Sequence, residues 1–186
     1  MKKFLLVFFS VSLIVLVCFV IFRPSTTVKV KTLRPTSTLG KEICVRLSKQ
    51  SGSTLKRTFA DVQSNLLFCE NNTGVMPVLT NKELTEVKKV FHELDFEEFK
   101  EEQVENGYLT WQADRFPKEK FSMISGLASD KVKNIAIKSE HYNQLNRISI
   151  SDNLWFWYVT FHKSKLKLPP KVISYDAKGH ILGENE

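Results

Sequence analysis

The most hydrophobic stretch of the chain covers residues 4–22, where Ser10 and Ser12 are the only clearly polar side chains. As a helix it would be about 28 Å long, close to the roughly 30 Å thickness of a bilayer core. Two lysines precede it, and Arg23 with Pro24 follows it. We therefore predict an N-terminal membrane anchor, a transmembrane helix within residues 1–23.

A cleaved secretory signal and a lipoprotein signal are the alternatives to an uncleaved anchor. Signal cores usually contain about 7–15 apolar residues and end at a small-x-small site, which is missing here. Cys18 follows the bulky Val17 and lies inside the apolar run, which is unlike a lipoprotein cysteine. Basic residues flank the segment on both sides, but the very short Met-Lys-Lys tail favours a C-terminal domain outside the cell membrane.

A spacer rich in Ser, Thr, Pro and basic residues is expected over residues 24–39. Residues 23–79 carry nine Lys/Arg against three acids, so the basic excess lies next to the predicted anchor. Each such charge gains about 1 kcal/mol near an anionic surface. The membrane, and an anionic wall polymer, are therefore expected partners. Nucleic acid is not, because neither a basic helix face nor an aromatic RNA-binding motif is present.

Residues 40–105 are predicted to form a mixed region of strands and helices. Residues 41–48 alternate apolar and polar positions, which favours a half-buried strand. Two capping boxes, at Thr58 and at Thr80, each precede an apolar stripe and predict helices over 58–69 and 80–99. The nine acids between Glu83 and Glu105 are interpreted as the solvated face of the second helix.

Residues 106–186 are predicted to form an antiparallel β region. Short apolar runs separated by polar turns favour strands, and residues 176–179 favour a hairpin loop with Gly179 at positive φ. The predicted fold class is therefore α+β, in which a transmembrane helix and a small mixed α/β part precede an antiparallel, β-sandwich-like C-terminal part. The expected strands lie at 108–113, 121–124, 132–138, 147–150, 154–162 and 171–175.

Cys44 and Cys69 are the cysteines outside the apolar segment. In an oxidising compartment they can form a disulfide that closes a loop of about 25 residues and contributes about 3 kcal/mol. Two free thiols are the alternative. Neither a catalytic histidine signature nor a C-x-x-C zinc spacing accompanies them.

The apolar run 154–161, within the strand predicted over 154–162, holds the candidate ligand-stacking aromatics Trp155, Trp157 and Tyr158. Exposed rings of this kind stack on sugars of a wall polysaccharide. A central strand that is buried on both faces has the same pattern, and the core interpretation is the favoured one.

No catalytic constellation is recognisable in the sequence. Walker A, G-x-G-x-x-G and G-x-S-x-G motifs are absent, and Phe96 occupies the place of the second histidine of a zincin after His92-Glu93. His141, His162 and His180 lie in separate predicted elements. No catalytic residue, cofactor or metal ligand is assigned.

The N-terminal segment and the C-terminal run from Pro169 to Leu182 resemble small, mostly uncharacterised envelope proteins of Bacillus-type Gram-positive bacteria. Many of those end in a strand, a Y-D-x-x-G hairpin and a final strand, after a turn like Ile124-Ser125-Gly126. The resemblance implies a location at the cell envelope. It implies no activity and no catalytic residue.

These patterns predict a membrane-anchored extracytoplasmic protein, a non-enzymatic binding or accessory module that contacts another envelope protein or a wall polymer. An envelope hydrolase with a site assembled from separate loops is one alternative. An inhibitor or self-protection protein is the other.

Overall fold

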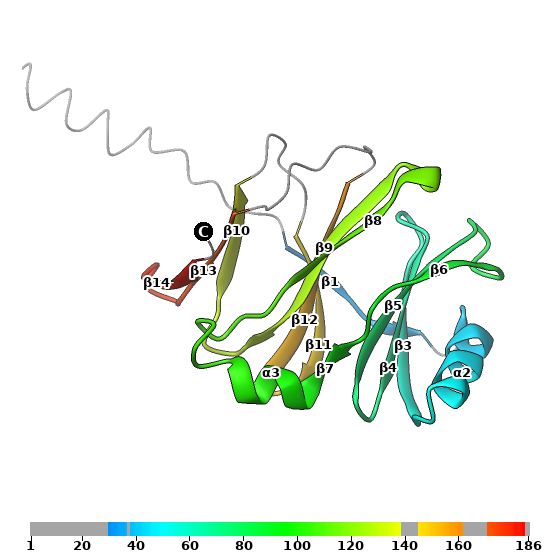
Figure 1. Cartoon of the computed structure of the whole chain (residues 1–186), viewed down its shortest axis with the longest axis horizontal. Coiled ribbons are helices and arrows are strands. Elements are labelled where there is room, and N and C mark those ends of the chain that lie inside the picture. The colour runs from blue at the N-terminus through cyan, green and yellow to red at the C-terminus, as the bar shows by residue number, and fades with distance from the viewer. Residues whose placement is uncertain (1–29, 37, 139–144, 162–170, 185–186) are drawn as a thin grey trace, which may run out of the picture.

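The protein is built mainly from β-strands, which form three sheets in a computed structural model (Figure 1). The structure describes residues 30–36, 38–138, 145–161 and 171–184. Within these ranges it contains the two α-helices α2, Lys41–Gln50, and α3, Phe96–Glu102, and a 3-10 turn at Pro117–Glu119.

The six-stranded sheet has the order β2-β3-β4-β5-β6, and the short β7 pairs with β5. Its central strand β4 is buried along its whole length. Helix α2 covers the outer face of this sheet, where Ile43 and Cys44 pack against Leu67, Cys69 and Val78. The bounds are Pro35–Thr36 for β2, Leu55–Asp61 for β3, Leu66–Asn71 for β4, Gly74–Thr80 for β5, Val87–Val90 for β6 and Leu94–Asp95 for β7.

The five-stranded sheet has the order β1-β11-β12-β9-β8 and is antiparallel apart from the parallel pair β1 and β11. Strands β9 and β12 form its centre and are almost wholly buried. The bounds are Val30–Leu33 for β1, Gln112–Phe116 for β8, Phe121–Ser129 for β9, Leu145–Ser151 for β11 and Leu154–Phe161 for β12.

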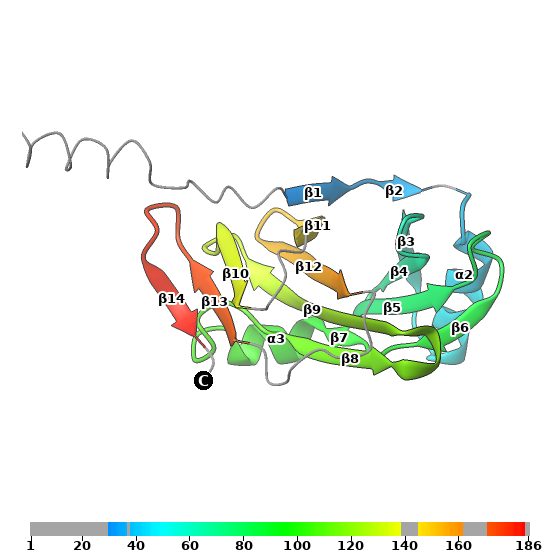
Figure 2. The ribbon, with the colours of Figure 1, turned by 90° about the horizontal axis from the view of Figure 1, so that it is seen from above.

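The three-stranded sheet has the order β10-β13-β14 and is antiparallel. It comprises Asn134–Lys138, Lys171–Tyr175 and Ile181–Glu184. Ile135 and Val172 pack against Trp155 and Trp157 of β12, so this sheet lies on one face of the five-stranded sheet. The six-stranded sheet lies on the other face, and Figure 2 shows the resulting succession of layers, with α2 at the far end.

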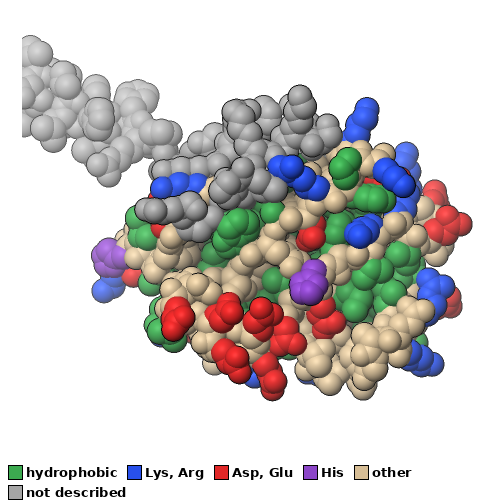
Figure 3. Space-filling view, viewed as in Figure 1, with side chains coloured by type: hydrophobic (Ala, Val, Ile, Leu, Met, Phe, Trp, Pro, Cys, Tyr) green, Lys and Arg blue, Asp and Glu red, His purple; other side chains and the backbone are tan. Residues whose placement is uncertain are grey.

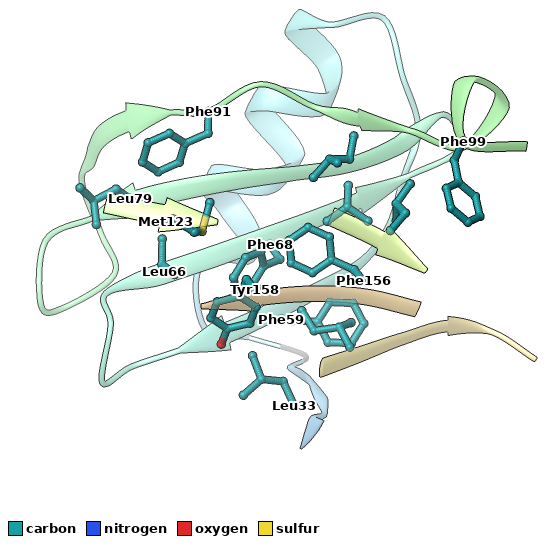
Figure 4. Close-up of a cluster of buried hydrophobic side chains, with 14 of the residues drawn as sticks. Leu33, Phe59, Leu66, Phe68, Leu79, Phe91, Phe99, Met123, Phe156 and Tyr158 are labelled. Atoms are coloured by element: carbon teal, nitrogen blue, oxygen red, sulfur yellow. The ribbon is translucent and has the colours of Figure 1, made fainter. Parts of the chain in front are cut away.

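The largest apolar cluster fills the space between the six- and five-stranded sheets (Figure 4). Phe68 of β4 contacts Phe156 and Tyr158 of β12, with ring centroids 5.1 and 4.5 Å apart. Alternation along β12 gives each face of the strand its own core: Phe156 and Tyr158 face β4, and Trp155 and Trp157 face β10 and β13. A fully apolar strand is what this two-sided burial requires.

The predicted α+β class is wrong, because the region 40–105 is also built largely from strands. The expected strand 41–48 is the helix α2 instead. Its residues alternate in polarity, but Ile43, Cys44 and Leu47 also share one helical face, and that face packs on the six-stranded sheet. Gly40 begins the helix at φ 70°, where a side chain would collide with Leu67.

The helices expected over 58–69 and 80–99 are wrong as well. Residues 58–69 fall in the hairpin of β3 and β4, whose turn leaves Val62 exposed. The second predicted stripe is divided between two cores: Leu84 packs under α2, whereas Phe91 and Leu94 face the five-stranded sheet. The apolar residues at helical spacing are thus buried on opposite faces of the six-stranded sheet rather than on one face of a helix. Within the predicted range and just beyond it, the only helix is Phe96–Glu102.

The strands predicted at 121–124, 132–138, 147–150, 154–162 and 171–175 correspond to β9 to β13, with residue 162 outside the described ranges. The strand predicted at 108–113 is shifted: β8 begins at Gln112, and before it Leu109 makes an isolated bridge to Ala128. The hairpin at 176–179 is confirmed too: Gly179 has φ 85°, and Asp176 Oδ1 accepts hydrogen bonds from the amides of Lys178 and His180. The predicted turn at 124–126 lies in the middle of β9 instead. No helix in the described ranges is both long and apolar enough to cross a bilayer, and the predicted anchor lies outside those ranges.

Candidate functional site

The candidate site is a groove of about 380 Å³ where α3 and the residues after it meet the three-stranded sheet. Two regions far apart in the sequence form its walls: the segment from the end of α3 to Trp111, and the hairpin of β13 and β14. The lining residues are Glu102, Glu105, Asn106, Leu109, Thr110, Trp111, Val172, Gly183 and Glu184.

Close backbone packing holds the walls of the groove together. Gly107 has φ 65°, and a Cβ on it would lie 2.6 Å from Cα of Gly183. The buried Ser174 Oγ lies 3.3 Å from the carbonyl oxygens of both Gly107 and Gly183. The segment after α3 and the hairpin of β13 and β14 are therefore packed directly against each other.

Carboxylates dominate the polar lining of the groove. Glu102 Oε2 accepts a hydrogen bond from Asn106 Nδ2 at 3.2 Å, and Glu184 forms an ion pair with Lys171. The described residues offer Glu105 no hydrogen-bond or ion-pair partner. Glutamates continue along the exposed face of α3, and Figure 3 shows acidic side chains gathered along the lower edge of this view, where α3 lies in Figure 1.

Trp111 gives the groove an aromatic wall. It is half-buried, whereas Trp155 and Trp157 are 2% and 0% exposed. Leu109 and Val172 are buried beside it in the same apolar cluster. The groove thus combines an apolar floor with a negatively charged rim, a lining suited to a ligand that carries both apolar and cationic groups.

A larger hollow of about 790 Å³ runs along the outer face of α2, between Thr38 and Gln50. Its described lining comes from this one helix and from Thr38, shortly before it. Since no second described element converges on it, we regard the smaller groove as the better candidate.

The aromatics proposed from the sequence do not form the site. Trp155, Trp157 and Tyr158 are all within 2% of complete burial, so a ligand cannot reach their rings. Trp155 Nε1 donates to the carbonyl of Ser129, and Tyr158 Oη donates to Asp61 Oδ2 at 2.9 Å. Their role is to fill both cores of β12.

Cys44 and Cys69 are joined by a disulfide that ties α2 to β4, with Cα atoms 5.2 Å apart. The two residues are 0% and 1% exposed. They belong to the core under α2, away from the groove, and their burial identifies the bond as a structural cross-link.

Two buried carboxylates at the seam between the sheets also have structural partners. Asp61 accepts from Tyr158 and lies 3.3 Å from Lys31 Nζ. Burial and the neighbouring Asp61 raise the pKa of Tyr158, so its hydroxyl remains a donor at all ordinary pH values. Arg57 pairs with Glu70 at 2.6 Å and also donates to the carbonyl of Ile150 on β11.

Asp114 on β8 carries the clearest electrostatic perturbation outside the core. Burial raises the pKa of this carboxyl, and the nearby His92 and Lys89 oppose the shift. Gln112 Nε2 lies within hydrogen-bond distance of the His92 carbonyl, at 3.0 Å, and of Asp114 Oδ2, at 3.3 Å. Neither the groove nor the hollow along α2 is lined by these residues, so we assign them no ligand.

This raised pKa predicts that Asp114→Asn slightly stabilises the protein at neutral pH, by no more than about 0.5 kcal/mol because solvent screens the half-buried carboxyl. The folded state holds the Asp114 proton more tightly than the unfolded chain, so stability falls as pH rises above the ordinary pKa of 3.8. Urea denaturation at pH 7 and pH 3 measures the effect, which should vanish at pH 3. A variant that is less stable than wild type at pH 7 would contradict the assignment.

No group of His, Cys, Asp and Glu side chains within the described ranges is arranged to hold a metal ion. Sequence reasoning did not identify the groove, because its walls come from distant segments. The acidic run up to Glu105 was the available signal, and it was interpreted as a solvated helix face. Comparison of the chain with models of protein families, with curated proteins and with solved structures finds no match.

Proposed function

We propose that this chain is a non-enzymatic binding module of the cell envelope, tethered by the apolar residues 4–22 with its folded part outside. The observation that carries the proposal is the groove, where an apolar floor and three glutamates converge without a recognisable catalytic constellation. Its negative charge favours another envelope protein as the partner over an anionic wall polymer.

The buried disulfide supports the extracytoplasmic location. Disulfides form and persist in oxidising compartments and are rare in the cytosol. Figures 1 and 2 both show the start of β1 on one side of the molecule and α3 on the opposite side. A tether that precedes β1 would thus leave the acidic helix and the groove accessible from the far side.

A self-protection or inhibitor protein is the second candidate function. The exposed acidic face of α3 favours it, because inhibitors of cationic enzymes and toxins commonly present such a surface to steer association. Both candidates use the same groove and differ in the consequence of binding.

Location can be tested with a single introduced cysteine at Val104, whose side chain is 68% exposed at the end of α3. We expect a membrane-impermeant maleimide to label Val104→Cys in intact cells. The unaltered chain is the matched control, because it reports any labelling of Cys18, whereas Cys44 and Cys69 are buried and bonded. Labelling of Val104→Cys only after lysis would place the domain in the cytoplasm and overturn the proposal.

Binding through the groove can be tested by placing a photo-crosslinking amino acid at position 104 in cells. We expect one discrete adduct that disappears when Glu102 and Glu105 are both changed to Gln. The same photo-crosslinker at Val62, exposed on the turn of β3 and β4, should not give that adduct. An adduct that is equally strong at both positions, or unaffected by the glutamine changes, would contradict a groove-specific partner.

A further inference from the structure

We propose that the groove binds an extended polypeptide segment in which basic and apolar side chains alternate, laid along the edge of β14 that has no strand partner among the described residues. This inference rests on the proposed function and names the chemistry of its partner. Three properties of the same surface support it: charge, apolar lining and an open strand edge.

The charge of the surface requires a cationic ligand. Glu102, Glu105 and Glu184 line the groove, and Lys171 offsets only the last of them. Residues 93–105, which lead into it, contain seven acids and one lysine, Lys100. Such a one-sided field steers a basic partner towards the groove and repels an acidic one.

The apolar lining selects against a simple inorganic cation. Trp111, Leu109 and Val172 provide a floor on which the aliphatic stem of a lysine or arginine packs, while its charged end reaches the glutamates. The face of a tryptophan also attracts such a cation directly. A ligand that contacts both the apolar floor and the glutamates therefore carries an apolar part next to its positive charge.

The strand edge favours an extended peptide over a small amine. β14 is the last strand in the order β10-β13-β14, so its second edge has no strand partner within the sheet. The hydrogen bond from Ser174 to Gly107 keeps the segment after α3 on the face of this sheet. Ile181, 57% exposed on β14, adds an apolar contact outside the groove.

Addition of a strand to such an edge supplies main-chain hydrogen bonds, and alternate side chains supply specificity. Because successive side chains of a strand point to opposite sides, one set of a peptide added to β14 would reach Glu102 and Glu105. The apolar set would then lie on the opposite face near Ile181, which shares this face with Glu184, itself paired with Lys171. Alternation of basic and apolar residues is the pattern that matches both sides.

The test uses the purified full chain and a short synthetic peptide of alternating lysine and leucine. Trp111 is the only half-exposed tryptophan, so its fluorescence and its quenching by acrylamide report on the groove. We expect saturable protection of Trp111. The double change Glu102→Gln and Glu105→Gln should weaken binding at least about tenfold, the loss expected when two charge contacts worth about 1.4 kcal/mol together are removed.

The matched control is the double change Glu97→Gln and Glu98→Gln, which removes the same charge from the first turn of α3, outside the groove lining. It should alter the affinity less than about twofold. A peptide of alternating glutamate and leucine should not bind, and N-methylation of the lysine–leucine backbone should weaken binding by blocking strand addition.

Equal weakening by both double changes would show a general charge attraction and overturn the groove as the site. Equal binding of the N-methylated peptide would overturn the strand-edge geometry. Equal protection of Trp111 by Ca²⁺ or by a polyamine would replace the peptide with a small cation. The lysine–leucine peptide could fail to bind while the cellular adduct at position 104 still depends on Glu102 and Glu105. In that case an extended basic peptide is the wrong ligand class, and the proposed function as a binding module stands.

Discussion

Replacement of Cys44 and Cys69 by alanine is expected to lower the free energy of unfolding by about 2–5 kcal/mol, the usual effect of removing a native disulfide from a small domain. The bond spans a sequence separation of 25 and is the covalent link between α2 and β4. Without it, α2 remains attached to the sheet only by the small cluster around Ile43 and Leu47. Helix α2 should therefore become the least stable part of the fold.

Denaturation of the purified full chain, followed by tryptophan fluorescence, measures this loss, and hydrogen exchange of the α2 amides locates it. Reduction of the unaltered protein is the matched control. Because both sulfurs are buried, a reducing agent should act only as fast as the protein opens. A loss below about 1 kcal/mol, or rapid reduction of the folded protein, would show that the bridge is not a structural cross-link.

Much of the sheet structure could be predicted from local patterns in the sequence. The run at 154–161 is apolar at every position but one, and burial of both its faces is what the three-layer arrangement requires. The hairpin at 176–179 depends on Asp176 and Gly179, whose backbone preferences are local. Such features were predicted correctly because the residues that determine them are neighbours.

The N-terminal part of the fold could not be predicted in this way. At 41–50 and 58–69 the same residues satisfy a helical and a strand period, so the distant partner decides between them. β4 became the centre of a sheet because β3 and β5 pair with its two edges. α2 became a helix because a bridge and an apolar face attach it to that sheet.

The groove could not be predicted from the sequence for a related reason. Glu102 and Trp111 are 81 and 72 positions before Gly183 in the sequence. Their meeting depends on the contact between Gly107 and Gly183. The sequence revealed the acidic run but not the apolar floor beside it. An isolated acidic run is most simply a solvated surface, and only the fold shows where it borders a cavity.

Gly126 is expected to be the least replaceable glycine of the sheet core, and Gly126→Ala should cost about 3 kcal/mol or more. A Cβ at this position would lie 1.9 Å from the carbonyl oxygen of Thr110 and 2.7 Å from Trp157 Nε1. Overpacking of a core typically costs about 1–3 kcal/mol even where side chains can adjust. Here the nearest obstacle is backbone, so the strand pairing itself must shift.

The neighbouring strand segment leaves little room for that shift. On the C-terminal side of Gly126, Thr110 donates its amide to the carbonyl of Leu127 at 2.9 Å, and Ser129 donates its amide to the carbonyl of Tyr108 at 3.0 Å. On the other side Gln112 pairs with Ser125, so the segment is held over β9 on both sides of the collision. Trp111 lies within this segment. Displacement of this segment would therefore open the core next to Trp157 and move the aromatic wall of the groove at the same time.

The same strand supplies the control for this prediction. Ser125→Ala introduces alanine one position earlier in β9. The hydroxyl that it removes is buried and has no hydrogen-bond partner among the described residues. This change should therefore alter the free energy of unfolding by less than about 1 kcal/mol. Trp157→Phe in the Gly126→Ala background should not restore stability, because it leaves the Thr110 carbonyl in place. Full rescue by that second change would identify the indole as the obstacle. A Gly126→Ala protein as stable as Ser125→Ala would show that β9 and residues 108–111 are not packed as closely as described.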